Sequence, residues 1–93
     1  MSRDILTTNA LRIDRLDNVV IVFEAVPAGG TVRWAEGCAV VARTAIPIGH
    51  KVASEPIGAG EAIRKYGYAI GTAGEAISSG DWVHTHNVSA KED

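Results

Sequence analysis

Four short segments of the chain repeat one pattern, and this pattern limits the fold more than any other feature. In each segment a glycine follows an aliphatic residue by three positions, and a second aliphatic residue follows three positions after the glycine. Glycine supplies the positive φ that closes a tight turn, and the proline in two of the segments presets φ. The pattern therefore predicts four equivalent glycine turns whose flanking aliphatic side chains lie in a core. The segments are 26–32, 46–52, 57–63 and 77–83.

The spacing of these segments and the composition indicate the fold class. The segments start 20, 11 and 20 residues apart, a symmetric arrangement that predicts two similar halves. The chain has 10 glycines, many Val and Ile residues and few aromatic residues, which is typical of short strands joined by tight turns. Its 93 residues suffice for one modest core. We therefore expect a mostly β, compact single domain.

The expected domain spans residues 10–88, between terminal tails at 1–9 and 89–93. Its elements follow from the alternation of apolar runs and turn residues along the chain. They are strands at 10–15, 19–24, 31–34 and 38–43, a hairpin turn at Glu36 and Gly37, and short helical turns at 62–66 and 72–77.

Charge and apolar patterning exclude several classes of partner. Nine Lys and Arg residues against eleven Asp and Glu give a net charge of −2, without a block of like charge. Nucleic acid and anionic membranes both need a basic patch, so neither is the expected partner. The apolar runs, such as 19–23, are too short for a membrane span or a signal peptide. The single cysteine, Cys38, fits a core position and a reducing cytoplasm rather than a disulfide framework.

Two histidines near the end of the chain are the strongest candidates for chemistry. His84 and His86 are two positions apart, so a strand would project both rings from one face, with Asn87 beside them. Two neutral imidazoles with an amide can hold a divalent cation or a polyhydroxy acid. The alternative is a pair of solvated surface histidines, and a metal would need a third ligand from elsewhere.

Two further groups carry polar side chains at turns. His50 follows Gly49, at an exposed turn position from which it can join the histidine pair or simply face solvent. Lys65 and Tyr66, next to Gly67, place a cation beside an aromatic ring. That pair can hold a carboxylate, and it can equally be a solvated edge.

Three linked motifs in the second half resemble the N-terminal region of the altronate and galactarate dehydratase family. They are IGHKVA at 48–53, IRKYGYAIG at 63–71 and GDWVHTHNV at 80–88, and LDNV at 16–19 resembles the family's opening strand. The resemblance covers residues 10–88. It implies a SAF domain with the β-clip fold. It also implies a lyase that uses a divalent metal, Fe²⁺, to eliminate water from a sugar acid, or sulfite from sulfolactate in a related enzyme.

The resemblance also implies a division of labour and a set of site residues. The chain is similar to a small subunit that pairs with a large catalytic subunit, and on its own it offers too little surface to enclose an active site. A binding or assembly module without chemistry is the alternative, and both leaving groups stay open. The family's motif positions fall on His50, Lys51, Lys65, Tyr66, Gly67, His84, His86 and Asn87. From the chemistry of these side chains we expect His84 and His86 to be catalytic, Lys51, Lys65, Tyr66 and Asn87 to bind substrate, and His50, His84 and His86 to bind the metal.

Overall fold

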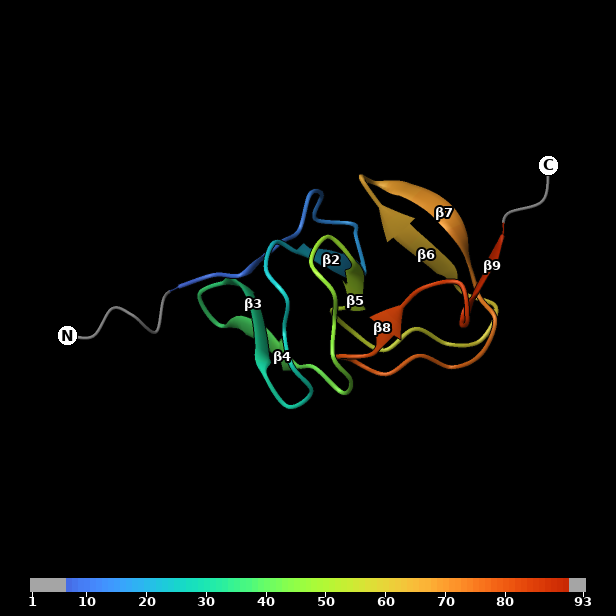
Figure 1. The fold of residues 1–93 in the computed structure, drawn as a ribbon. Coiled ribbons are helices and arrows are strands. Elements are labelled where there is room, and N and C mark those ends of the chain that lie inside the picture. Colours follow the sequence, from blue (N-terminus) through green and yellow to red (C-terminus); the bar gives the residue numbers. More distant parts are fainter. Residues whose placement is uncertain (1–6, 91–93) are drawn as a thin grey trace.

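Short antiparallel strands form the framework of the protein. The computed structural model describes residues 7–90, and within that range it contains strands and turns but no helix. The strands make three sheets, in the orders β1-β2-β5-β8, β3-β4 and β6-β7-β9, with the β3–β4 hairpin and the β6-β7-β9 sheet on opposite sides of the central strands (Figure 1). The strands are β1 (Ala10–Leu11), β2 (Val19–Val22), β3 (Thr31–Ala35), β4 (Cys38–Val41), β5 (Lys51–Ala53), β6 (Ala62–Lys65), β7 (Tyr68–Ala73), β8 (Trp82–Val83) and β9 (Val88–Ala90).

The expected mostly β fold is confirmed, but the helical turns are wrong. Residues 62–65 form β6, and 72–73 end β7, which pairs with β6 in antiparallel register. A helix of five or six residues has little stability by itself, whereas pairing these strands buries Ile63 completely. The hairpin turn predicted at Glu36 and Gly37 is present, and Gly37 has a φ of 77°.

The predicted similarity of the two halves is confirmed, with an offset of 31 residues. Val26 pairs with Ile46 in an isolated bridge, and Ile57 pairs with Ile77 in the equivalent bridge 31 positions further on. Each bridge belongs to its own buried cluster, so the core is duplicated. One cluster is Ala10, Val20, Val22, Val26, Val32, Ala42, Ile46 and Val52; the other is Val19, Ala53, Ile57, Ile63, Ala73, Ile77 and Val83.

Two asparagines, Asn9 and Asn18, make equivalent amide hydrogen bonds to the two hairpins, although they are only nine residues apart. Asn9 accepts a hydrogen bond from the backbone of Arg33 and donates one to that of Thr31. Asn18 does the same with Arg64 and Ala62, at the other hairpin. Each asparagine therefore ties the chain before a strand of the four-stranded sheet to one of the two equivalent hairpins. Residues 1–6 and 91–93 of the expected tails lie outside the described residues.

The four glycine turns are equivalent, as predicted. Gly29, Gly49, Gly60 and Gly80 have φ values of 85°, 83°, 84° and 89°. In every copy the residue after this glycine donates its backbone N–H to the carbonyl three positions earlier, at 2.8–3.2 Å. The shared hydrogen bond and the shared φ explain why the pattern recurs in the sequence.

The residue after the glycine has a second duty in only two copies. Glu61 accepts a hydrogen bond from the backbone N–H of Gly58, and Asp81 accepts one from Ser78. In the other two copies the position of the donors Gly58 and Ser78 is occupied by Pro27 or Pro47, and proline has no backbone N–H to satisfy. No carboxylate is needed there, so the position after Gly49 can carry the imidazole of His50.

Substitution at two equivalent glycines should separate backbone strain from collision. At Gly60 a Cβ would meet open space, so Gly60→Ala should cost about 1–2 kcal/mol through the positive φ alone. At Gly80 a Cβ would also collide with the carbonyl oxygen of Val41. We therefore expect Gly80→Ala to be clearly more destabilising than Gly60→Ala in urea unfolding. Equal losses would contradict the close approach at Gly80.

Candidate functional site

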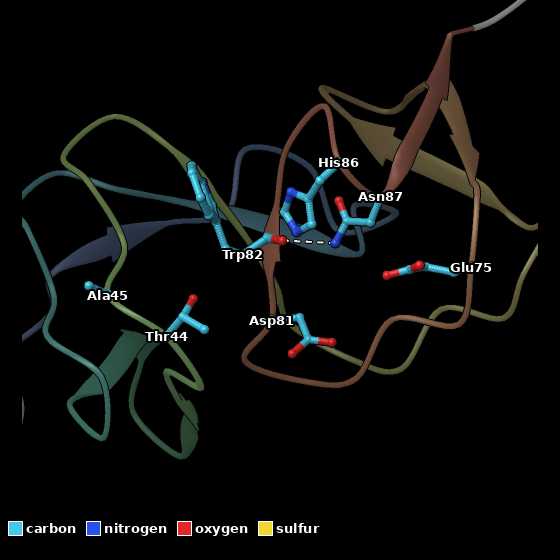
Figure 2. A pocket seen from close by; sticks show the side chains of 7 residues that line it. All are labelled: Thr44, Ala45, Glu75, Asp81, Trp82, His86 and Asn87. Atoms are coloured by element: carbon cyan, nitrogen blue, oxygen red, sulfur yellow. Dashed lines mark hydrogen bonds between the residues drawn. The ribbon is translucent and has the colours of Figure 1, made fainter.

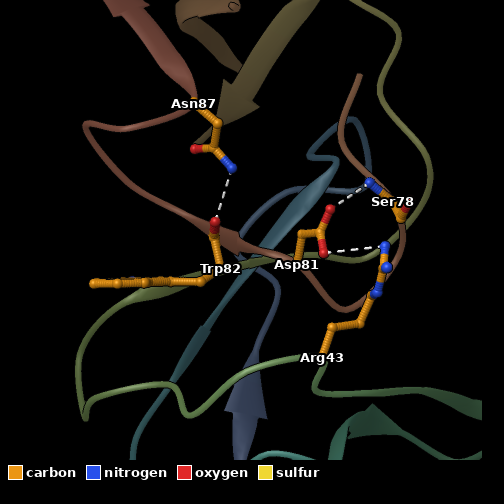
Figure 3. Close-up of polar contacts among 5 residues, drawn as sticks. All are labelled: Arg43, Ser78, Asp81, Trp82 and Asn87. Carbon is orange, nitrogen blue, oxygen red and sulfur yellow. Dashed lines mark hydrogen bonds and ion pairs between the residues drawn. The ribbon is translucent and has the colours of Figure 1, made fainter. Parts of the chain in front are cut away.

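A tight turn at 84–87, rather than a strand, presents the two C-terminal histidines. Strand β8 ends at Val83, so the predicted continuation of the strand through His86 is wrong. The cause is the side chain of Asn87, which is only 4% exposed. Its Oδ1 accepts a hydrogen bond from the backbone N–H of His84 at 2.9 Å. Its Nδ2 donates to the carbonyl of Trp82, also at 2.9 Å (Figure 3).

These two bonds engage both ends of the Asn87 amide with the backbone. In addition, the backbone N–H of Asn87 donates to the carbonyl of His84 at 3.1 Å. Asn87 therefore closes the turn and positions His84, and its direct contact with a substrate stays a prediction.

The turn brings three imidazoles around one indole. We call His50, Trp82, His84 and His86 the imidazole–indole cluster. The ring of His84 stacks on Trp82, with centroids 5.0 Å apart and planes 7° apart. His86 is tilted against the same indole at 5.4 Å, and the rings of His50 and His84 lie 4.9 Å apart. The structure thus brings His50 to the histidine pair, because His50 immediately precedes β5, which pairs with β8.

Trp82 also contacts His50 through a hydrogen bond. Its Nε1–H donates to Nδ1 of His50 at 3.1 Å. An indole nitrogen only donates, so Nδ1 of His50 is the acceptor of this bond. Trp82 was not among the site residues predicted from the sequence.

The cluster does not by itself make a complete metal site. Within residues 7–90, no three His, Cys, Asp or Glu side chains are grouped so that they can hold a metal ion. A divalent cation at this face would need ligands from outside the described chain. Metal binding by His50, His84 and His86 stays a prediction.

Desolvation and neighbouring charges lower the pKa of one histidine of the cluster. The pKa of His84 is lowered, first by desolvation and then by His50, Lys51 and His86. Lys51 follows the same rule: its pKa is lowered by burial and by the nearby charge of Lys65. His84 therefore stays a neutral imidazole to a lower pH than an ordinary histidine, which suits a proton acceptor.

Two hollows of opposite charge lie at this turn. The acidic hollow, of about 460 Å³, contains two carboxylates and one side of the cluster (Figure 2). Its lining residues are Thr44, Ala45, Glu75, Asp81, Trp82, His86 and Asn87. The basic hollow, of about 320 Å³, is lined by Lys51, Ile70, His84, Thr85 and Val88. His86 thus borders one hollow and His84 the other.

Within the acidic hollow, Asp81 is already engaged by its own chain. Its Oδ1 lies 3.3 Å from the guanidinium of Arg43, and its Oδ2 accepts from the backbone N–H of Ser78 (Figure 3). Figure 2 shows Glu75 on the opposite side of this hollow from Thr44 and Ala45.

Tyr66 and Lys65 stand at the tip of the β6–β7 hairpin. Tyr66 has a φ of 59°, and with Gly67 it donates two backbone N–H groups to the buried carboxylate of Asp17. Its side chain is 53% exposed and is not among the residues that line either hollow. The ammonium of Lys65 lies 4.9 Å from the ring centre of Tyr66. Contact of Lys65 and Tyr66 with a substrate stays a prediction.

Together, the fold and the cluster define a small SAF-type β-clip domain with an imidazole-rich face. Residues 8–91 match the family model of the altronate/galactarate dehydratase SAF domain, and the chain belongs to this family. The described residues contain no helix that is long and apolar enough to cross a membrane.

Three curated relatives carry the names of lyases or of a lyase subunit. The chain is 34% identical to altronate dehydratase of Bacillus subtilis over 77 residues, which are 83% of this chain and 15% of that protein. It is 43% identical over 49 residues to the (2R)-sulfolactate sulfo-lyase subunit alpha of Chromohalobacter salexigens, covering 53% of this chain and 52% of that subunit. The subunit alpha of Paracoccus pantotrophus is 42% identical over 52 residues, with 56% of this chain and 78% of that subunit covered. The match thus spans about half of one sulfo-lyase subunit and a small part of the dehydratase.

Proposed function

We propose that the chain is the small subunit of a cytoplasmic, metal-dependent lyase that eliminates water from a sugar acid of the altronate or galactarate type. Its partner is a large catalytic subunit. The observation that carries the proposal is the imidazole–indole cluster, in which a neutral His84 stands beside the half-buried cation of Lys51. Membership of the dehydratase SAF family supports the reaction class.

A second candidate is the elimination of sulfite from sulfolactate. Two of the relatives carry the name of sulfolactate sulfo-lyase subunit alpha, and both are more than 40% identical over the aligned residues. Either elimination begins with the same problem, the removal of a weakly acidic proton next to a carboxylate. The leaving group would be recognised by the large subunit.

The chain's own residues suit the first half of that chemistry. A neutral imidazole at His84, which lines the same hollow as Lys51, can accept the proton from the carbon next to the carboxylate. His86 lines the other hollow of the same turn, and we assign it the return of a proton to the departing group from that side. Lys51 can hold the carboxylate through a charge-assisted hydrogen bond. A divalent metal, Fe²⁺ by resemblance, would stabilise the developing negative charge. The cluster does not complete a site for one, so the large subunit would supply its ligands.

Reconstitution tests this proposal. Neither this chain nor the large subunit alone should turn over substrate, and mixing them with Fe²⁺ should produce activity toward altronate, galactarate or (2R)-sulfolactate. The residues for acid, base and metal binding do not all fit on one small surface, which is why each part should be inert. Turnover by the isolated chain, or full activity of the large subunit without it, would contradict the proposal. A stable complex of the two subunits that is inactive toward all three substrates would favour a role as an assembly module.

A further inference from the structure

Lys51 is a half-buried cation without a described counter-ion. It lies on β5, which pairs with β2 on one side and β8 on the other. Within residues 7–90 the one ion pair is that of Arg43 with Asp81, so Lys51 has no carboxylate partner there. Removing a cation from water without a compensating anion is unfavourable, and the nearby Lys65 adds repulsion. An anion bound at Lys51 would relieve both costs.

The basic hollow is built to receive such an anion. Three of its five lining side chains, those of Lys51, His84 and Thr85, can donate a hydrogen bond, and no carboxylate lines it. The other two, Ile70 and Val88, offer an apolar wall for a carbon chain. Its volume of about 320 Å³ is at the low end of the range for small-molecule sites.

The acidic hollow on the other side of the turn has the opposite character, because Glu75 and Asp81 line it. Charge alone therefore directs a small anion to one side of the imidazole–indole cluster. On that side the ring of His84 is next to Lys51, and Trp82 stacks behind it.

We infer that the basic hollow is a binding site for the anionic head group, carboxylate or sulfonate, of a small hydroxy acid, with Lys51 as the anchor and Thr85 as a neutral donor. The apolar wall of Ile70 and Val88 contacts the carbon chain. The hydroxy-acid part of this inference rests on the proposed function, but binding of the anion is a property of this chain alone. The sulfonate and the carboxylate share the same chemistry of recognition: a compact oxyanion that accepts several hydrogen bonds.

Nuclear magnetic resonance titration of the full 93-residue chain with two simple probes tests the inference. Glycerate supplies a hydroxy carboxylate, 2-hydroxyethanesulfonate supplies a hydroxy sulfonate, and methyl glycerate is the uncharged control. At constant ionic strength, at least one of the two anions should cause saturable shifts centred on Lys51, His84 and Thr85. The anion that binds with the higher affinity identifies the head group as a carboxylate or a sulfonate. Shifts that do not saturate, or that methyl glycerate and chloride reproduce, would overturn the inference.

Two variants separate a specific anchor from a general positive field. Lys51→Gln should weaken binding at least tenfold, whereas Arg64→Gln, which removes one exposed charge from β6, should change it less than threefold. Lys51→Arg should recover part of the affinity if Lys51→Gln perturbs the fold. Equal weakening in Lys51→Gln and Arg64→Gln would overturn the inference.

The result is independent of turnover. Saturable binding with an inactive reconstituted complex would leave the anion site and remove the proposed function. Activity of the complex without any anion binding by this chain would support the proposed function and overturn the anion site.

Discussion

His84→Ala and His86→Ala should each lower the turnover of the reconstituted lyase by about a hundredfold or more, the scale typical of losing a proton-transfer group. His84 is positioned by its stack on Trp82 and by the hydrogen bond from its backbone N–H to Asn87. His86 borders the acidic hollow and contacts the other side of the cluster. The measurement is kcat and KM of each variant, with the large subunit in excess.

A matched variant distinguishes lost chemistry from lost packing. The stack of His84 on the indole is worth about 0.5–1.5 kcal/mol, and His84→Phe keeps an aromatic ring there while removing the imidazole. We expect His84→Phe to be as inactive as His84→Ala but to melt closer to the unmodified chain. If both alanine variants keep near-normal rates, the histidines are surface features and the site lies entirely in the partner.

Asn87→Ala should give the largest loss of stability among polar substitutions at this face. It leaves the N–H of His84 and the carbonyl of Trp82 without their partner at a buried position. Each unsatisfied group costs about 1–3 kcal/mol, so the total for the two groups should be about 2–6 kcal/mol. For a chain of this length each kcal/mol lowers the melting temperature by roughly 4–8 °C, so the melting temperature should fall by about 10 °C or more.

Two companion variants make the result specific. Asn87→Asp keeps the oxygen that accepts from His84 but loses the donor to Trp82, so its stability should fall between those of Asn87→Ala and the unmodified chain. Thr85→Ala changes an exposed residue of the same turn and should shift the melting temperature by only a few degrees. A small effect of Asn87→Ala, comparable to that of Thr85→Ala, would show that backbone contacts alone hold the turn.

The fold could be predicted where the sequence pattern is local. A glycine turn is decided by four or five neighbouring residues, and Gly29, Gly49, Gly60 and Gly80 all have the expected positive φ. The alternation that makes 62–65 a strand depends instead on its partner β7 and on burial of Ile63. Short apolar runs are ambiguous without that partner, which is why helical turns were expected there.

The candidate site could be predicted in its members but not in its geometry. His84 and His86 stand out by spacing, yet the turn that presents them depends on where the amide of Asn87 binds. The addition of His50 depends on the pairing of β5 with β8, which joins residues thirty or more positions apart. Trp82 was overlooked because an aromatic residue beside Val83 has the pattern of a core anchor, and its half-buried ring shows its role only with its neighbours in place.

Pro47 and His50 occupy the second and fifth positions of the same glycine turn, and together they let this turn carry an imidazole without leaving a backbone donor unsatisfied. In two of the four glycine turns, an acidic residue after the glycine accepts a hydrogen bond from a backbone N–H of the turn; in the other two, a proline stands at that donor position and no acceptor is required. The residue after the glycine can therefore have another role only in a copy with proline, and after Gly49 it is His50, which accepts a hydrogen bond from Trp82. Positions 47 and 50 therefore depend on each other physically. Replacing Pro47 by a residue with a backbone N–H would create a donor that a carboxylate at position 50 could satisfy, as in the copies with Glu61 and Asp81, but that carboxylate would take the place of an imidazole of the cluster.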